Sequence, residues 1–134
     1  KGKAAEMLTP GTHGSTFGGN PLVTRVALSV LDVFEKDLIL NNVTKMSQYF
    51  ESEFKSKIMG SNVVKELRIK GLMIGIGLDE NIIDCNKLTQ KALDDHLLIN
   101  ITGNSIRMLP PLIITKKEID ILIKKILILI SIKD

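Results

Sequence analysis

The spacing of apolar residues changes along this chain, and that change restricts its fold more than any other feature. In residues 21–38 and 43–58, apolar side chains recur every three or four positions, the spacing of a helix with one apolar face. In residues 63–78, charged and apolar residues alternate and glycines then interrupt an apolar run, which is typical of a strand pair or one long bent strand. Helical spacing returns in residues 84–98 and again after Thr115.

Local signals mark where these helices begin. Asn20 precedes a proline, and this pair predicts a helix start, because asparagine caps a helix and proline fits its first turn. The second helix is expected after the asparagine pair at positions 41–42. Thr115 and Glu118 have the spacing of a capping box, which predicts the start of the last helix.

A hairpin is expected toward the C-terminus. Residues 98–102 and 106–110 read as short strands on either side of the turn sequence GNS. The complete order is then loop, helix, helix, one or two strands, helix, strand, strand, helix. This order favours an α+β domain in which a short antiparallel sheet carries helices on one face.

Length and composition limit the classes of function. At 134 residues the chain is long enough for one domain with a core. The net charge of +3 is spread along the sequence, and 4% aromatic residues leave little surface for stacking on bases. We therefore expect no nucleic-acid partner. We also expect no metal site.

Cysteine content and hydropathy point to a cytoplasmic protein. The single cysteine, Cys85, excludes an internal disulfide, fits a reducing compartment, and is interpreted as a small half-buried apolar residue on a helix. The sequence shows no signal peptide, and the apolar run ILILISI has seven residues where a membrane span needs about 20. A soluble chain without membrane contact is expected.

The glycine-rich segment GTHGSTFGGNPL, residues 11–22, is the most unusual local sequence. Its glycines leave backbone N–H groups unobstructed, Ser15 and Thr16 supply hydroxyl donors, and a helix start follows, where negative charge is favoured. The segment matches neither GxxxxGK[ST] nor GxGxxG after a strand, so it does not indicate a nucleoside triphosphate or dinucleotide site. From the residues alone, anion binding and a plain connector remain equally open.

Arg107 is the second candidate site residue. It stands between apolar neighbours in the hairpin ahead of PPL, so its guanidinium needs an anionic partner or contact with solvent. A planar guanidinium suits a carboxylate, but an edge-strand arginine in water is the alternative. Arg25 and Arg68 lack comparable support and are interpreted as surface or structural residues.

Three segments resemble a known family. PGTHGSTFGGNPL (residues 10–22), VVKELRIKGLMIGIGL (63–78) and NSIRMLPPLIITKKEID (104–120) are similar to the acetylornithine aminotransferase group. That group is an ornithine-type, class III subgroup of the pyridoxal-phosphate-dependent aminotransferases with the fold-type I architecture. Nearly the whole chain aligns in order. One departure is Ile69, where the family usually has glycine, so the local backbone there is expected to differ.

The resemblance implies a site shared between two subunits of a homodimer, with a small amino acid as substrate. Thr16 would donate to the phosphate of pyridoxal 5'-phosphate bound mainly by the partner, and Ser15 beside it would contact phosphate or substrate. Arg107 would hold the α-carboxylate of the substrate. His13 is expected to pack in the loop, and residues 18–20 to shape it.

The resemblance also implies what the sequence does not contain. The family's Schiff-base lysine lies before the glycine-rich loop in a motif that neither Lys1 nor Lys3 matches, and the aspartate motif for the pyridinium nitrogen is absent. The chain is therefore expected to be the C-terminal third of an enzyme, without a catalytic residue and inactive alone. Residues 1–40 would end the large domain with the phosphate loop and interdomain helix, and residues 41–134 would form the C-terminal small domain.

The leading interpretation is an enzyme part that moves an amino group between N2-acetylornithine and 2-oxoglutarate in arginine biosynthesis. Succinyldiaminopimelate and ornithine remain open as amino donors. An alternative of another class is a non-catalytic α+β module whose glycine-rich loop binds a phosphorylated ligand or a partner protein, or mediates dimerisation. A third is a non-catalytic remnant of a decayed gene that still folds or dimerises.

Overall fold

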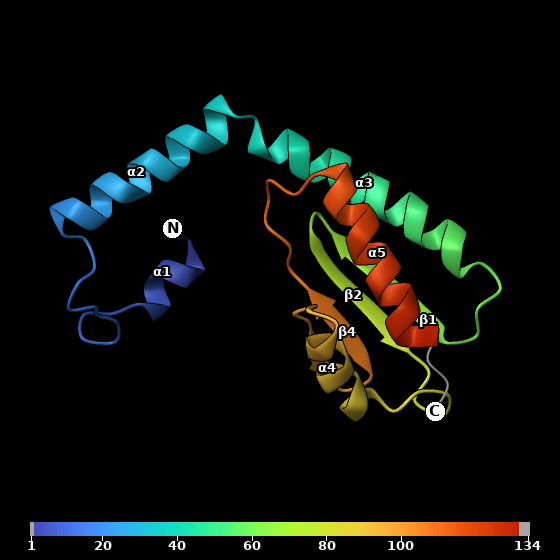
Figure 1. Cartoon of the computed structure of the whole chain (residues 1–134). Helices are drawn as coiled ribbons and strands as arrows, with labels where there is room; N and C mark the ends of the chain where they lie inside the picture. Colours follow the sequence, from blue (N-terminus) through green and yellow to red (C-terminus); the bar gives the residue numbers. More distant parts are fainter. Residues whose placement is uncertain (1, 132–134) are drawn as a thin grey trace. The chain divides into compact units, whose positions relative to one another are not determined.

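The computed structural model describes residues 2–131 and divides the chain into two compact units (Figure 1). The first unit is Lys1–Leu38 and the second is Ile39–Asp134. No helix of the described residues is long and apolar enough to cross a membrane.

The first unit consists of a short helix, the glycine-rich loop and a long helix. Helix α1 spans Lys3–Met7 and was not predicted from the sequence, whereas α2 spans Pro21–Lys36 as expected. Oδ1 of Asn20 accepts a hydrogen bond from the backbone N–H of Val23 at 3.0 Å, which confirms the predicted cap. Within this unit most apolar residues of α2 are exposed, among them Leu22 and Leu31, and Phe34 is half-buried.

Helix α3 begins earlier than the sequence predicts. It spans Ile39–Ile58, so the asparagine pair lies inside the helix and not before it. The break with α2 is instead at Leu38, whose φ of 49° is left-handed. Nδ2 of Asn42 donates to the carbonyl oxygens of Leu112 at 2.9 Å and Ile114 at 3.2 Å, which fixes the loop ahead of the last helix.

The second unit contains a four-stranded antiparallel sheet. Its strands are β1 (Val64–Lys70), β2 (Met73–Leu78), β3 (Asn100–Thr102) and β4 (Ser105–Met108), in the order β1-β2-β4-β3. Gly71, with a φ of 56°, makes the tight turn between β1 and β2. The expected strand pair and C-terminal hairpin are therefore both confirmed.

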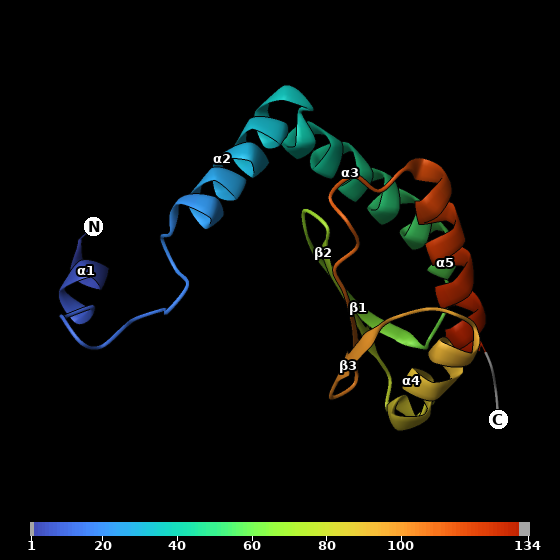
Figure 2. The same cartoon turned by 60° about the vertical axis from the view of Figure 1, so that its left-hand side comes forward.

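Helices α3, α4 (Cys85–Asp94) and α5 (Lys116–Ser131) lie on one side of the sheet (Figure 2). This arrangement confirms the α+β fold. Phe50 and Phe54 of α3 are fully buried, and their rings stack with centroids 5.4 Å apart. Residues of all three helices and of β2 and β4 complete the core: Met46, Ile74, Ile76, Leu78, Leu88, Ala92, Ile106, Met108, Ile119, Ile123 and Ile126.

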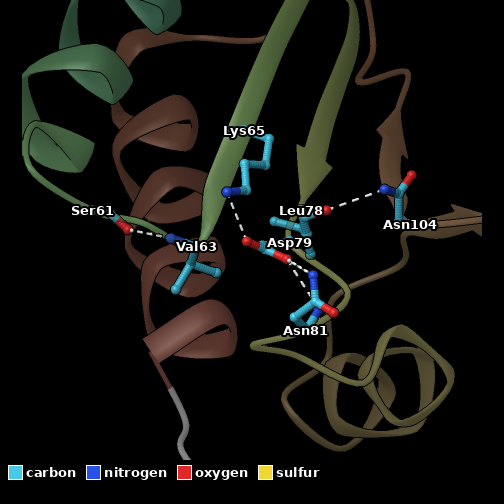
Figure 3. Close-up of polar contacts among 7 residues, drawn as sticks. All are labelled: Ser61, Val63, Lys65, Leu78, Asp79, Asn81 and Asn104. Atoms are coloured by element: carbon cyan, nitrogen blue, oxygen red, sulfur yellow. Dashed lines mark hydrogen bonds and ion pairs between the residues drawn. The ribbon is translucent and has the colours of Figure 1, made fainter.

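Polar contacts hold the end of the sheet that leads into α4 (Figure 3). Asp79 follows β2, and its carboxylate accepts from Nζ of Lys65 at 2.7 Å and from the backbone N–H of Asn81 at 3.0 Å. The contact with Lys65, followed by that with Asn81, lowers the pKa of Asp79. Asn104 and Leu78 exchange two hydrogen bonds, of 2.8 and 3.2 Å, which join β2 to the β3–β4 turn.

Candidate functional site

The glycine-rich loop is folded by its own short-range hydrogen bonds. Oγ of Ser15 accepts from the backbone N–H of Gly18 at 2.9 Å, and Nδ2 of Asn20 donates to the carbonyl oxygen of Phe17 at 2.7 Å. A Cβ on Gly18 would stand 2.9 Å from Cβ of Ser15, so only glycine fits there without a shift. The loop thus has a defined shape ahead of the N-terminus of α2.

Two of the three hydroxyl groups of this loop, those of Ser15 and Thr16, are available as donors. Ser15 uses an oxygen lone pair for Gly18, which leaves its O–H proton free for another acceptor. Thr16 is exposed and makes no hydrogen bond with any residue that the structure describes. Two hydroxyl donors, backbone N–H groups and a following helix start are the donors that suit a phosphate group. The residues present therefore fit the phosphate of pyridoxal 5'-phosphate.

Thr12 and His13 are weaker candidates for ligand contact than Ser15 and Thr16. The hydroxyl of Thr12 already donates to the carbonyl oxygen of Thr9 at 2.6 Å. His13 is exposed, so the packing expected for it is not present within the first unit. Within the loop, Ser15 and Thr16 are thus the better candidates for contact with a ligand.

Arg107 lies on β4, on the sheet face away from the core. Its chain neighbours Ile106 and Met108 are buried, whereas Arg107 is exposed, because successive side chains of a strand point to opposite faces. It pairs with Gly75 of β2 and with Asn100 of β3. It makes no hydrogen bond or ion pair with any of residues 2–131, so its guanidinium is available to an anion.

A cavity of about 390 Å³ lies on this same part of the sheet. Arg107, Arg68 and Lys70 line it together with Thr102 and Ser105. Sequence reasoning placed Arg68 among the surface or structural residues and did not connect it with this site. Arg68 and Arg107 line the same cavity because β1 pairs with β2 and β2 pairs with β4. This strand register is not visible in the sequence alone.

Cys85 and potential metal ligands add nothing to this site. Cys85 is buried, and burial, followed by the charges of Asp84 and Glu80, raises the pKa of its thiol. A raised pKa disfavours the thiolate that a nucleophile requires, which agrees with the expected apolar role. Among the described residues there is no group of three or more histidine, cysteine, aspartate or glutamate side chains that could hold a metal ion.

Known proteins similar to this chain agree on one family. The family described as Aminotransferase class-III matches residues 1–130. Acetylornithine aminotransferase of Nitrosomonas europaea is 37% identical over 97% of this chain and 33% of its own length. Acetylornithine aminotransferase of Caldanaerobacter subterraneus is 44% identical over 85% of this chain and 29% of its own length.

Solved structures give the same result. Ornithine delta-aminotransferase of Plasmodium falciparum superposes with a TM-score of 0.81 at 30% identity, over 95% of this chain and 33% of that one. Acetylornithine aminotransferase of Elizabethkingia anophelis superposes with a TM-score of 0.76 at 32% identity, over 95% and 32%. The chain spans about a third of the length of the curated relatives it matches.

The small α+β fold, with a hydroxyl-bearing loop in one unit and an exposed guanidinium in the other, is that of part of a fold-type I aminotransferase. The chain belongs to the class III aminotransferase family.

Proposed function

We propose that this chain is the C-terminal part of a pyridoxal-phosphate-dependent aminotransferase that moves an amino group between N2-acetylornithine and 2-oxoglutarate. The observation that carries this proposal is the match to acetylornithine aminotransferases at 37–44% identity over most of the chain. Residues 1–40 would then end the large domain, and residues 41–134 would form the small domain. The whole enzyme would be a homodimer.

The loop residues supply hydrogen bonds to the cofactor in this proposal. Thr16 donates its hydroxyl proton to the phosphate of pyridoxal 5'-phosphate held mainly by the partner subunit. Ser15 donates to the same phosphate or to the substrate, while Gly18 keeps its oxygen in place. The free hydroxyl of Thr16 and the fixed orientation of Ser15 support these roles, because neither donor must first break an internal bond.

Arg107 holds the α-carboxylate of the amino acid substrate. Its side chain is exposed, without an ionic partner among residues 2–131, and borders a cavity of a size suited to a small metabolite. A bidentate guanidinium–carboxylate pair fixes the orientation of the substrate as well as its position. The cofactor, when bound, withdraws electrons from the bonds of the substrate α-carbon, and Arg107 keeps that carbon in place.

The amino donor is proposed from the relatives and not from this chain's own residues. Acetylornithine aminotransferases of Nitrosomonas europaea and Caldanaerobacter subterraneus are 37% and 44% identical to the matched part of the chain, and ornithine aminotransferase of Staphylococcus carnosus is 40% identical over 90% of the chain. Rates measured with N2-acetylornithine, succinyldiaminopimelate and ornithine as donors would decide between them. A higher kcat/KM for either of the other two would replace acetylornithine in the proposal.

The cofactor role is tested with Thr16→Ala. The variant is made in a full-length class III aminotransferase that carries this chain as its C-terminal third. The affinity for pyridoxal 5'-phosphate is measured by titrating the apoenzyme at the cofactor absorbance band. Loss of one charge-assisted hydrogen bond predicts affinity about tenfold weaker or more.

Thr12→Ala is the matched control for that experiment. It removes a hydroxyl from the same loop, but one already bonded to Thr9, so cofactor affinity should not change. Unchanged affinity in Thr16→Ala would remove Thr16 from its proposed role. Equal weakening in both variants would indicate a loss of loop structure instead.

The 134-residue chain by itself should not transaminate. Incubation with pyridoxal 5'-phosphate followed by borohydride reduction should label no unique lysine, because no segment here matches the family's Schiff-base lysine motif. Labelling of one lysine in stoichiometric amount would contradict this. Mass spectrometry of the digested protein makes the measurement.

A further inference from the structure

The side-chain amide of Asn42 holds the segment that leads from β4 to α5. Its Nδ2 donates to the carbonyl oxygen of Leu112 at 2.9 Å and to that of Ile114 at 3.2 Å. Both views show this segment running beside the N-terminal part of α3 (Figure 1 and Figure 2). One amide group therefore fixes two backbone carbonyls that lie 70 and 72 positions further along the chain.

The segment that Asn42 holds is short and stiff. β4 ends at Met108, one position after Arg107, and two prolines follow at positions 110 and 111. A proline ring fixes its φ at about −65°, so these two residues have little freedom to rotate. The N–H of Ile114 also donates to the carbonyl oxygen of Pro111 at 3.0 Å, which closes a turn. A displacement at the held carbonyls is therefore passed toward β4 and is not absorbed by the backbone between them.

Asn42 itself starts from a fixed part of helix α3. Its side chain is half-buried, and Ile39 and Met46 on the same helix are buried. Val43 beside it packs against the core, and its Cγ1 would lie 3.1 Å from a Cβ placed on Gly71 in the β1–β2 turn. The amide is thus carried by a helix turn that is anchored to the sheet independently of the two hydrogen bonds.

Arg107 has no side-chain contact that would set its position by other means. It makes no hydrogen bond or ion pair with any of residues 2–131. The place and direction of its guanidinium therefore depend on the backbone that carries it. That backbone pairs with β2 and β3 and continues directly into the segment that Asn42 holds.

We propose that Asn42 is a positioning residue for Arg107, acting through the proline-containing segment after β4. This inference rests on the carboxylate role of Arg107 under the proposed function and deepens it. A guanidinium binds a carboxylate through two parallel N–H donors, so the pair depends on orientation as well as on distance. A misplacement of about 1 Å caused by a residue remote from the reaction can lower a rate about hundredfold.

The test is a double-mutant cycle in the full-length enzyme used for Thr16→Ala, with kcat/KM for the amino donor as the measurement. Arg107→Gln should lower kcat/KM about hundredfold, the loss expected when a charge pair is broken. Asn42→Ala alone should lower it about tenfold through misplacement of Arg107. When Arg107 is already replaced by Gln, Asn42→Ala should cost less than about twofold, because the group that it positions is gone.

Two further variants show that the amide donor is the cause. Asn41→Ala makes the same change one position earlier, at an exposed side chain without a hydrogen bond to any described residue, and should leave kcat/KM unchanged. Asn42→Asp keeps the shape but has no N–H donor and directs a charge at two carbonyl oxygens, so it should lower kcat/KM at least as far as Asn42→Ala. The affinity for pyridoxal 5'-phosphate and the circular dichroism spectrum should stay the same in all variants of the cycle.

The outcomes separate this inference from the proposed function. If Asn42→Ala lowers kcat/KM equally with and without Arg107, or if it lowers cofactor affinity or helix content, Asn42 supports the fold as a whole and the inference is wrong. Unchanged kcat/KM in Asn42→Ala also overturns it. In these cases a loss in Arg107→Gln leaves the role of Arg107 in place. If Arg107→Gln itself changes nothing, the carboxylate role of Arg107 is wrong and the inference is wrong with it.

Discussion

The hydroxyl group of Tyr49 donates a hydrogen bond of 2.7 Å to Oδ1 of Asp120 and so connects helix α3 to helix α5. Nζ of Lys116 lies 4.9 Å from the centroid of the same ring, a cation–π contact. The hydrogen bond to Asp120, followed by partial desolvation, raises the pKa of Tyr49 from 10.0 to about 12.

This raised pKa gives a direct spectroscopic prediction. Tyr49 is the only tyrosine in the sequence, so the phenolate absorbance near 295 nm reports on it alone. The titration midpoint should lie near pH 12 and not near 10. Because the pKa is raised in the folded state, the stabilisation is complete below pH 10 and is lost as the pH rises toward 12.

Asp120→Asn is the control for Tyr49, because it removes the carboxylate but keeps an acceptor oxygen at the same place. The midpoint should move back toward the ordinary value of 10.0. A wild-type midpoint near 10 would show that the bond between the two helices does not form in solution.

The second prediction concerns the core of the second unit. Phe50 is fully buried and stacks on Phe54, so Phe50→Ala leaves a cavity between α3 and the sheet. The free energy of unfolding should fall by about 3–5 kcal/mol. Urea denaturation followed by circular dichroism measures it.

Phe17→Ala is the matched control for Phe50→Ala. It makes the same chemical change in the glycine-rich loop, where the ring is 79% exposed. The free energy of unfolding should change by no more than about 0.5 kcal/mol. Similar losses in both variants would contradict the assignment of the core to the second unit.

Most secondary structure was predictable because its signals are local. The cap at Asn20, the capping box at Thr115 and Glu118, and the change from helical to strand spacing each depend on residues close in sequence. The predicted start of α3 was wrong because it depends on a contact between residues far apart in sequence. Asn42 looked like a helix breaker, yet its amide binds two carbonyl groups about 70 positions away, which no local pattern reveals.

The candidate site was likewise predictable only in part. Arg107 was identified because it stands between apolar neighbours ahead of PPL in a segment that resembles the family, but nothing near Arg68 in sequence connects it with Arg107. Their relation depends on two strand registers through Gly75, and register is a property of the assembled sheet. Gly75 is where the side chain of Arg68 crosses the sheet.

The third prediction concerns the turn between β1 and β2. Gly71 has a φ of 56°, and a Cβ there would stand 3.1 Å from Cγ1 of Val43. Gly71→Ala therefore adds left-handed strain and a tight contact with α3, and should destabilise the fold by about 1–2 kcal/mol. Thermal denaturation of the variant gives the value.

Gly60→Ala separates the backbone strain from the tight contact with Val43 in the destabilisation expected for Gly71→Ala. Gly60 has a φ of 82°, but a Cβ there would meet nothing within 4 Å, so only the backbone strain applies. Gly60→Ala should therefore cost less than Gly71→Ala. If the two losses are equal, the contact with Val43 makes no contribution.

The fourth prediction concerns the start of α5. Oε2 of Glu118 accepts from the hydroxyl of Thr115 at 2.7 Å and from its backbone N–H at 2.8 Å. Thr115→Ala removes the hydroxyl and should lower the free energy of unfolding by about 1 kcal/mol. Thr44→Ala is the control, because Thr44 lies inside α3 and its replacement by alanine, a better helix former, should cost nothing.

The same cap makes stability depend on pH. The bonds from the hydroxyl of Thr115, and next from its N–H, lower the pKa of Glu118 below its ordinary value of 4.5. A lowered pKa means that the stabilisation is complete above pH 4.5 and is lost as the pH falls through the pKa of the folded state. Glu118→Gln keeps an acceptor but not the charge, so its difference from wild type should be largest near neutral pH and shrink in acid. A difference that stays constant down to acid pH would show that the charge of Glu118 does not contribute to the cap.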